Sequence, residues 1–253
     1  MTRIAETCER MSNDGQSAPR YWAVVPAAGI GARMGGERPK QYLDVAGRPI
    51  IAHTLARLCN HARISGVVVA LADGDEWWAS MIESQSTFAR APVVVTGGAT
   101  RRDSVLCGLD ALSETASAGD WVLVHDAVRP CLTDADIDRL MDALAGDEVG
   151  GLLAVPVRDT MKRANGEHRV CETVDREALW HAQTPQMFRL GALRDALAKS
   201  VAANREVTDE AQAMELAGAR PRLVQGHEEN IKITRPDDLE LAEVILARHG
   251  TPP

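Results

Sequence analysis

The sequence predicts an α/β protein: a single domain with a mostly parallel, Rossmann-like sheet flanked by helices, plus a projecting β-hairpin arm. Short apolar runs rich in β-branched residues alternate with amphipathic segments along the 253 residues. The runs are continuously apolar, as in parallel strands that are covered on both faces. One segment, 159–176, breaks the rhythm with two polar, strand-like runs around Asn165-Gly166, a dipeptide typical of hairpin turns.

The expected elements follow one another along the chain. Strands are expected at 22–27, 66–72, 92–96, 121–125 and 152–157, with helices between them at 49–60, 74–84, 100–113 and 133–145. After the arm, the pattern predicts helices at 190–201 and 208–217, a short strand at 222–225 and a closing helix from 236 to about 249. In such sheets, ligands bind beyond the carboxyl ends of the strands.

Composition restricts the possible partners and location. The formal net charge of −8 argues against a surface that recruits nucleic acid or anionic membrane. Five scattered cysteines without a C-x-x-C pair predict a reduced, cytoplasmic protein, and no apolar run approaches the roughly 20 residues that span a bilayer. Residues 1–20 lack the apolar core of a signal peptide, so we expect a loose leader followed by one domain at 21–250.

The loop after the first expected strand, 26–42, gathers glycines and cations. It does not match the dinucleotide fingerprint, because Met34 stands at the third glycine position, nor the Walker pattern, because Glu37-Arg38 replaces the lysine and hydroxyl residue. What remains is a backbone-rich turn that carries Arg33 and Lys40. Such a turn suits a triphosphate, although a glycine-rich turn with a solvated basic edge would have the same composition.

Two further loops combine polar groups with expected strand and helix ends. "GGATRRDSV" (97–105) is expected to open a helix at Thr100 or Arg101, with Ser104 in its first turn, where free N–H groups favour a polar ligand. The alternative is a capped helix with surface arginines. Asp126 ends a buried strand and is a candidate ligand of Mg²⁺, or else it turns the chain and pairs with Arg129. His125 is predicted to pack within its strand.

Lys232 is the third candidate cation of the site. It stands between Ile231 and Ile233, so on a strand its side chain would face away from theirs. The chain has only four lysines among its 28 basic residues, which marks Lys40 and Lys232 as positions suited to a compact ammonium group. A solvent-facing lysine on an edge strand is the alternative.

These strings together resemble the 2-C-methyl-D-erythritol 4-phosphate cytidylyltransferase family, within the sugar-nucleotidyltransferase-like superfamily. The resemblance runs from about Trp22 to about Ala247. Seven strings carry it in order: "PAAGIGARM…PKQY", "GGATRRDSV", "VHDAVRP" (124–130), "PVRDTMKR" (156–163), "TVDREALWHAQTPQMF" (173–188), "VTDEA" (207–211) and "ENIKITRPDDL" (229–239).

The resemblance implies transfer of CMP from CTP to 2-C-methyl-D-erythritol 4-phosphate with release of pyrophosphate. It implies that Arg33 and Lys40 stabilise the pentacoordinate α-phosphorus and that Lys232 with Arg176 positions the acceptor phosphate. Asp126 would hold Mg²⁺ or another divalent cation. The implied nucleotide-binding residues are Ala27, Ala28, Gly29, Arg33, Lys40, Gly98, Ala99, Ser104 and Ala127, and the implied substrate-binding residues are Asp126, Arg129, Thr160, Arg176, Thr184, Thr208 and Lys232.

Two further expectations concern the role of the arm and the alternatives to the implied activity. A polar hairpin is marginally stable alone, so we expect the arm at 159–176 to join two chains in a homodimer, with Thr160 and Arg176 serving the partner's site. Alternatives to the implied activity are a cytidylyltransferase for another polyol phosphate, such as ribitol 5-phosphate, and a non-catalytic nucleotide-binding protein on the same fold.

Overall fold

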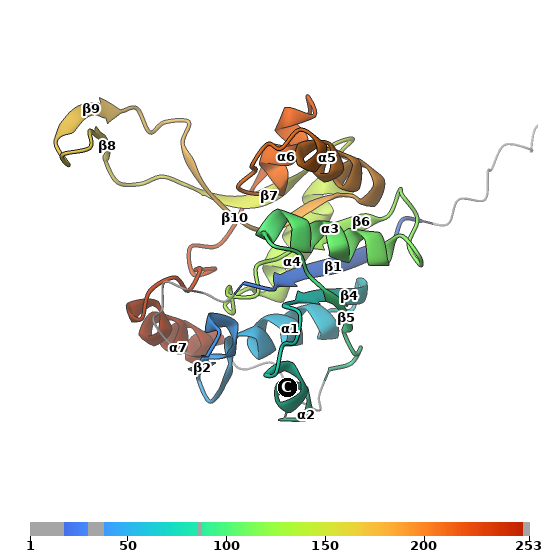
Figure 1. Ribbon diagram of the computed structural model, residues 1–253. Helices are drawn as coiled ribbons and strands as arrows, with labels where there is room; N and C mark the ends of the chain where they lie inside the picture. Colours follow the sequence, from blue (N-terminus) through green and yellow to red (C-terminus); the bar gives the residue numbers. More distant parts are fainter. Residues whose placement is uncertain (1–17, 30–37, 85–87, 250–253) are drawn as a thin grey trace, which may run out of the picture.

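A seven-stranded sheet forms the centre of the molecule (Figure 1). The computed structural model describes residues 18–29, 38–84 and 88–249. The strand order is β11-β7-β10-β6-β1-β4-β5. All neighbours pair in parallel except β10, which is antiparallel to both β6 and β7. The strands are β1 (Tyr21–Ala27), β4 (Ile64–Leu71), β5 (Val93–Thr96), β6 (Trp121–Val124), β7 (Gly150–Pro156), β10 (Trp180–Arg189) and β11 (Arg222–Gln225).

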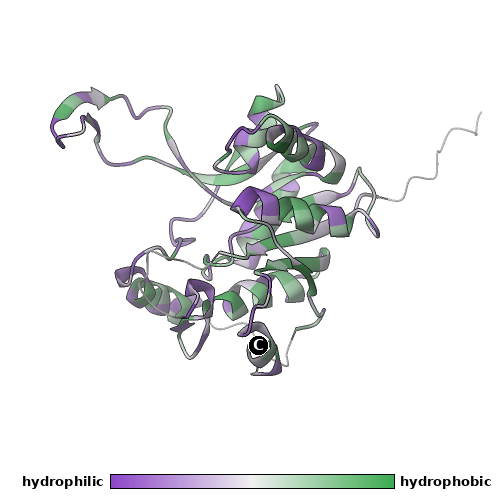
Figure 2. Cartoon of the chain, in the orientation of Figure 1, coloured by the Kyte–Doolittle hydropathy of each residue, from purple (hydrophilic) through white to green (hydrophobic). Residues whose placement is uncertain are grey.

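Helices cover both faces of the sheet, which is why its central strands are continuously apolar. Along β1, Ala23 and Val25 belong to one buried cluster and Val24 to another, so alternate side chains serve opposite faces. The first cluster includes α1 (Ile50–Asn60) and α4 (Asp134–Leu144); the second includes α3 (Arg101–Leu112), α5 (Leu190–Ala202) and α6 (Glu210–Leu216). Figure 2 shows the hydrophobic residues concentrated on the strands and on these helices.

The remaining small elements lie around this core. A third buried cluster joins α7 (Asp237–His249) to Val45, Ile50 and Ile233. A 3-10 helix, η2 (Lys40–Tyr42), precedes the short pair β2 (Asp44–Val45) and β3 (Arg48–Pro49). Helix α2 (Trp78–Ser84) begins four residues later than expected, because the Asp75 carboxylate accepts the N–H groups of Trp77 and Trp78 and holds the preceding turn.

The expected fold class is confirmed, and three strands were missed: β10 and the two-residue strands β2 and β3. Each predicted helix and strand is present with its ends shifted by a few residues. Strand β10 was not predicted, since its pairing with β7 is interrupted between Ala182 and Gln186. A strand broken in this way shows no regular alternation. Among the described residues, no helix is long and apolar enough to cross a membrane.

The arm is a separate two-stranded sheet that projects from the body (Figure 1). It consists of β8 (Met161–Ala164) and β9 (Val170–Val174), and only Val174 among these residues is partly buried. The hairpin was predicted correctly, but its loop is longer than the two residues that Asn165-Gly166 favours. Asn165 donates its N–H to the Arg169 carbonyl, and His168 takes the positive φ of 58°.

Candidate active site

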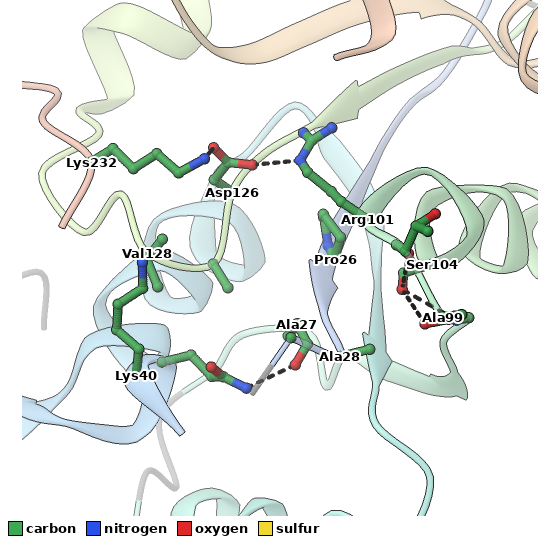
Figure 3. Close-up of a pocket in the computed structure, with 15 residues that line it drawn as sticks. Pro26, Ala27, Ala28, Lys40, Ala99, Arg101, Ser104, Asp126, Val128 and Lys232 are labelled. Carbon is green, nitrogen blue, oxygen red and sulfur yellow. Dashed lines mark hydrogen bonds and ion pairs between the residues drawn. The ribbon is translucent and has the colours of Figure 1, made fainter. Parts of the chain in front are cut away.

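A cavity of about 220 Å³ opens where β1 and β6 end and α3 begins (Figure 3). Ten of the residues predicted from the sequence line it: Ala27, Ala28, Gly29, Lys40, Gly98, Ala99, Ser104, Asp126, Ala127 and Lys232. The other lining residues are Pro26, Gln41, Thr100, Arg101 and Val128. Arg33 lies outside the described residues. The carboxyl ends of neighbouring parallel strands therefore gather loops that are distant in the sequence, as expected for this class of sheet.

Buried side chains fix the two loops that follow β1 and β6. Gln41, which is 4% exposed, donates from Nε2 to the Ala27 carbonyl at 2.8 Å. Thr54 donates from Oγ1 to the Ala127 carbonyl at 3.1 Å. Because each carbonyl has a buried protein donor, both cavity walls are held in place by the body of the protein.

The start of α3 forms a third wall. Thr100 and Asp103 cap the helix reciprocally: the Thr100 hydroxyl accepts the Asp103 N–H, and the Asp103 carboxylate accepts the Thr100 N–H. Ser104 donates its hydroxyl to the Thr100 carbonyl at 2.9 Å and accepts the Gly98 N–H at 3.2 Å. A Cβ atom on Gly98 would lie 2.4 Å from the Asp103 Cβ, so this close turn requires glycine.

Asp126 is the centre of the charge network. Its Oδ1 atom lies 2.9 Å from Arg101 Nε, and its Oδ2 atom lies 2.9 Å from Lys232 Nζ and 3.6 Å from Arg129 Nε. In Figure 3, Arg101 and Lys232 approach the carboxylate from opposite sides. Burial raises the pKa of this carboxyl group, but the three cations outweigh burial and hold the pKa well below its usual range. Asp126 is therefore ionised at neutral pH.

Arg101 connects this network to α6. Its Nη1 and Nη2 atoms donate to the two carboxylate oxygens of Glu210 at 2.7 and 3.0 Å. Glu210 is 1% exposed. Burial lowers the pKa of Arg101, but the carboxylates of Glu210 and Asp126 raise it by more than burial lowers it. The guanidinium therefore stays charged. A bidentate pair of this kind fixes the orientation of the Nε atom that meets Asp126.

A chain of hydrogen bonds also holds the backbone of Asp126 in place. The Asp126 N–H donates to Thr184 Oγ1 at 3.1 Å, and Thr184 Oγ1 lies 2.9 Å from His125 Nδ1. His125 Nε2 lies 3.1 Å from the Arg129 carbonyl, which can only accept. Nε2 therefore carries the proton and Nδ1 accepts from the Thr184 hydroxyl. Burial lowers the pKa of His125 to about 4, so the ring is neutral.

The predicted acceptor residues are not all brought together within one chain. Thr184 and Arg129 contact Asp126 through the bonds described above. Thr208 is exposed before α6, where its N–H donates to Gln212 Oε1 at 2.6 Å. Thr160 and Arg176 lie on the projecting arm, where the Arg176 guanidinium donates to the Arg158 carbonyl. Five predicted residues among those described thus lie outside the cavity lining: Arg129 and Thr184, which contact Asp126, and Thr160, Arg176 and Thr208.

Lys232 lines the cavity without being on a strand, in contrast to the expectation. Residues 231–234 belong to no helix or strand, and the Ile233 N–H donates to the Val128 carbonyl at 3.0 Å. Ile231 and Ile233 pack in the third cluster, so the lysine side chain does face away from them. The predicted orientation is correct, since burial alternates along the segment: Ile231 and Ile233 are at least partly buried, whereas Lys232 is exposed.

Arg101, Glu210 and Gln41 were not predicted as site residues. Arg101 and Glu210 stand within two of the strings used for the resemblance, "GGATRRDSV" and "VTDEA". Nothing in the first string distinguishes Arg101 from Arg102, whose guanidinium pairs instead with Asp103. The pairing across 109 positions was the information that the sequence lacked.

Comparison with known proteins identifies the family. A sequence model of the 2-C-methyl-D-erythritol 4-phosphate cytidylyltransferase family (IspD) matches residues 21–248. The chain belongs to this family. A cytidylyltransferase of this name from Azoarcus sp. (strain BH72) is 55% identical over 228 residues, which cover 90% of this chain and 94% of the relative.

Solved structures agree with this assignment. A crystal structure of 4-diphosphocytidyl-2C-methyl-D-erythritol synthase has a TM-score of 0.78 and 36% identity, covering 90% of this chain and 99% of the other. The cytidylyltransferase from Thermus thermophilus has a TM-score of 0.73 and 35% identity, with the same coverage. As a member of the family, the chain is a nucleotidyltransferase that catalyses CTP-dependent cytidylyl transfer in isoprenoid synthesis.

Proposed function

We propose that the cavity of Figure 3 binds CTP and is where 2-C-methyl-D-erythritol 4-phosphate attacks it. The supporting observation is that Lys40, Arg101 and Lys232, from three distant parts of the chain, line one cavity together with the glycine-containing loops. A phosphate oxygen of the acceptor forms a bond to the α-phosphorus of CTP as the bond to pyrophosphate breaks. The products are 4-diphosphocytidyl-2-C-methyl-D-erythritol and pyrophosphate.

The proposed reaction needs charge stabilisation and no general base. A phosphomonoester has a second pKa near 6, so the acceptor is a dianion at neutral pH and already nucleophilic. His125 is not available as a base, because both ring nitrogens have buried protein partners. The barrier comes from bringing two anions together. Lys40 and Lys232 would offset this repulsion, Lys40 at the α-phosphorus and Lys232 at the acceptor phosphate, with Arg33 completing the set.

We extend the proposal to Mg²⁺ at Asp126. The residues fit such an ion, since an ionised carboxylate lines the cavity and Mg²⁺ takes one or two protein carboxylates beside phosphate oxygens and water. The Oδ2 partner, Lys232, is 40% exposed in its side chain and can be displaced, whereas Arg101 is also held by Glu210. Bound Mg²⁺ would neutralise part of the triphosphate charge.

The projecting arm supports a homodimer as the working unit of this proposed site. Thr160 and Arg176 lie on a segment that extends from its own body (Figure 1), and a two-fold dimer would bring each arm to the other chain's cavity. A cytoplasmic location is proposed on the free thiols of Cys59, Cys107, Cys131 and Cys171.

Pyrophosphate release measures the proposed activity directly. CTP with Mg²⁺ is incubated with 2-C-methyl-D-erythritol 4-phosphate, with ribitol 5-phosphate, or without acceptor. We expect release with the methylerythritol phosphate and at least tenfold less with ribitol 5-phosphate, a discrimination of about 1.4 kcal/mol. Equal or faster release with ribitol 5-phosphate would favour the other polyol activity. Absence of release with every acceptor, together with CTP binding, would favour the non-catalytic alternative.

A further inference from the structure

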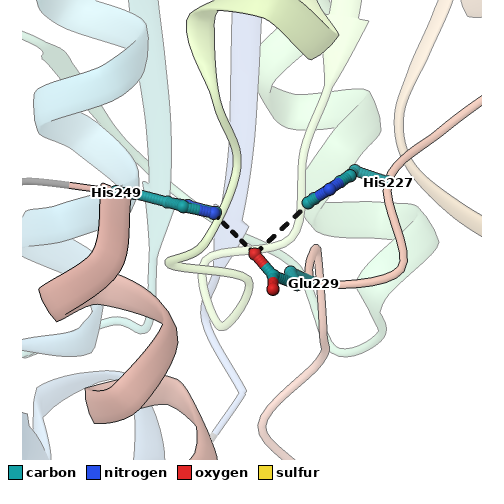
Figure 4. A group of neighbouring side chains, drawn as sticks. All are labelled: His227, Glu229 and His249. Carbon is teal, nitrogen blue, oxygen red and sulfur yellow. Dashed lines mark hydrogen bonds and ion pairs between the residues drawn. The ribbon is translucent and has the colours of Figure 1, made fainter.

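A second group of polar side chains lies outside the cavity lining. His227 and Glu229 follow β11, and His249 is the last residue of α7. One potential ligand atom from each residue lies within 4.8 Å of the other two. Glu229 Oε2 is 2.6 Å from His249 Nε2 and 3.9 Å from His227 Nδ1. Figure 4 shows the two imidazoles approaching this carboxylate from opposite sides.

The backbone around the cluster is held from several directions. The His227 carbonyl accepts the Gln183 side-chain amide at 2.9 Å and the Asn230 N–H at 3.1 Å. Arg248 Nη1 lies 3.0 Å from Glu229 Oε1, which leaves Oε2 facing the imidazoles. His249 ends a helix, where the helix dipole favours positive charge. Glu229, His249 and the backbone of His227 are thus held in place before any ligand arrives.

An ion pair alone does not account for all three residues. Glu229 and His249 form a hydrogen bond, but His227 Nδ1 is too far from Glu229 Oε2 for one. Two imidazole nitrogens and one carboxylate oxygen are a common ligand set for zinc. Ligand bonds of about 2.0–2.2 Å place tetrahedral ligand atoms about 3.3–3.6 Å apart, so Glu229 and His249 must separate slightly and His227 must approach them. His227, with 48% of its side chain exposed, has room to turn.

We propose that His227, Glu229 and His249 bind a divalent transition-metal ion, with zinc the best match to these ligands. The metal would replace the proton shared by Glu229 and His249, and water would complete its coordination. It would fasten the end of α7 to the segment that carries Asn230 and Lys232. Asn230 is fully buried, and its side-chain amide donates to the Thr184 carbonyl at 2.8 Å. The same segment therefore runs from the three proposed metal ligands to the cavity that Lys232 lines.

Zinc binding to untagged, chelator-treated protein tests this proposal without an activity assay. Calorimetric titration is repeated in competition with a chromophoric chelator on wild type, Glu229→Gln, His249→Asn and His168→Asn. We expect one zinc ion per chain in wild type, at least tenfold weaker binding in the first two variants, and unchanged binding in His168→Asn. His168 is the matched control because it is exposed in the arm loop, where asparagine tolerates its positive φ.

Two measurements on wild type remain decisive even if a variant folds poorly. At a zinc concentration 100-fold above Kd, the melting temperature should rise by roughly 5 °C or more, with slower hydrogen exchange at residues 227–233. Substituted Co²⁺ should show tetrahedral or five-coordinate d–d bands without thiolate charge transfer. Thiolate charge transfer, or equal zinc affinity in Glu229→Gln and His249→Asn, would overturn the assignment.

Discussion

The cavity and the arm use the same kinds of charged pairs in different surroundings. In the cavity, Asp126 has a side chain 8% exposed and contacts Arg101, Lys232 and Arg129. On the arm, Arg163 pairs with Glu172 at 2.5 Å, yet their side chains are 66% and 54% exposed. Buried pairs leave an uncompensated charge when one partner is lost, whereas exposed pairs contribute about 0–1 kcal/mol.

This difference in burial indicates which part of the proposed site is formed within one chain. The cavity positions its charged groups through partners on several elements of the same body, such as Glu210 for Arg101. The arm strands contact each other, and their residues are almost entirely exposed. We therefore expect mutations in the cavity to act within one chain and those at the base of the arm to act across the proposed dimer.

The largest expected effect is that of Asp126→Asn. We predict that turnover falls about a thousandfold and that the free energy of unfolding falls by roughly 3 kcal/mol, because Arg129 and Lys232 lose their buried anion. High Mg²⁺ or Mn²⁺ should restore part of the activity, since an amide oxygen is a weaker ligand for these ions. Turnover and metal dependence equal to wild type would make Asp126 a structural residue only.

The same variant tests how the contribution of Asp126 to the free energy of unfolding depends on pH. The folded-state pKa of Asp126 is lower than its ordinary value of 3.8. The ionised carboxylate therefore contributes its full stabilisation above about pH 5, and this stabilisation is lost as the pH falls through 3.8 towards the lowered pKa. Urea denaturation should show the stability gap between wild type and Asp126→Asn narrowing as the pH is lowered from 7 to about 3. A gap that stays constant would mean that the cations do not stabilise the ionised form.

Lys40→Ala should have the next largest effect. We predict at least about a hundredfold lower kcat with much less effect on CTP affinity, because its ammonium is assigned to charge that develops in the transition state. Lys199→Ala, an exposed lysine on α5, is the matched control and should behave as wild type. Equal losses in CTP affinity and turnover would indicate uniform nucleotide binding instead.

Arg176→Ala tests whether the arm acts across a dimer. Homodimers of Arg176→Ala and of Lys40→Ala should each be nearly inactive. After co-refolding in equal amounts, half the dimers are mixed, and each mixed dimer holds one site with an intact body and an intact arm. Roughly a quarter of all sites should then work, by two-fold counting. If native mass spectrometry finds mixed dimers without this recovery, Arg176 does not serve the partner's site.

The smallest effect is expected at the middle of the arm. Arg163→Ala removes the exposed pair with Glu172 and should change the free energy of unfolding by less than about 0.5 kcal/mol. Activity should stay within about twofold of wild type. A larger loss, measured by urea denaturation and steady-state kinetics, would show that this exposed pair is buried in the working assembly and would weaken the contrast with the cavity.

The sequence by itself determined the helices, all the strands of the main sheet except β10, and most of the cavity wall. Runs such as 121–124 are apolar enough to be assigned from composition, and loops after parallel strands converge by a general rule. The loops that contain Gly29, Gly98 and Asp126 were therefore assigned to one site before their positions were known. The local sequence pattern is enough to assign these elements, because the periodicity of apolar residues and the geometry of a turn depend on residues that are close in the sequence.

Only the tertiary structure decided which distant groups meet. It placed β10 antiparallel between β6 and β7, although residues 180–189 show no regular alternation. It also paired Arg101 with Glu210 and brought His249 to Glu229. With 28 basic and 36 acidic residues in the chain, charge pattern leaves many pairings open. The choice among them depends on the packing of whole elements, and that packing is fixed by contacts far apart in sequence.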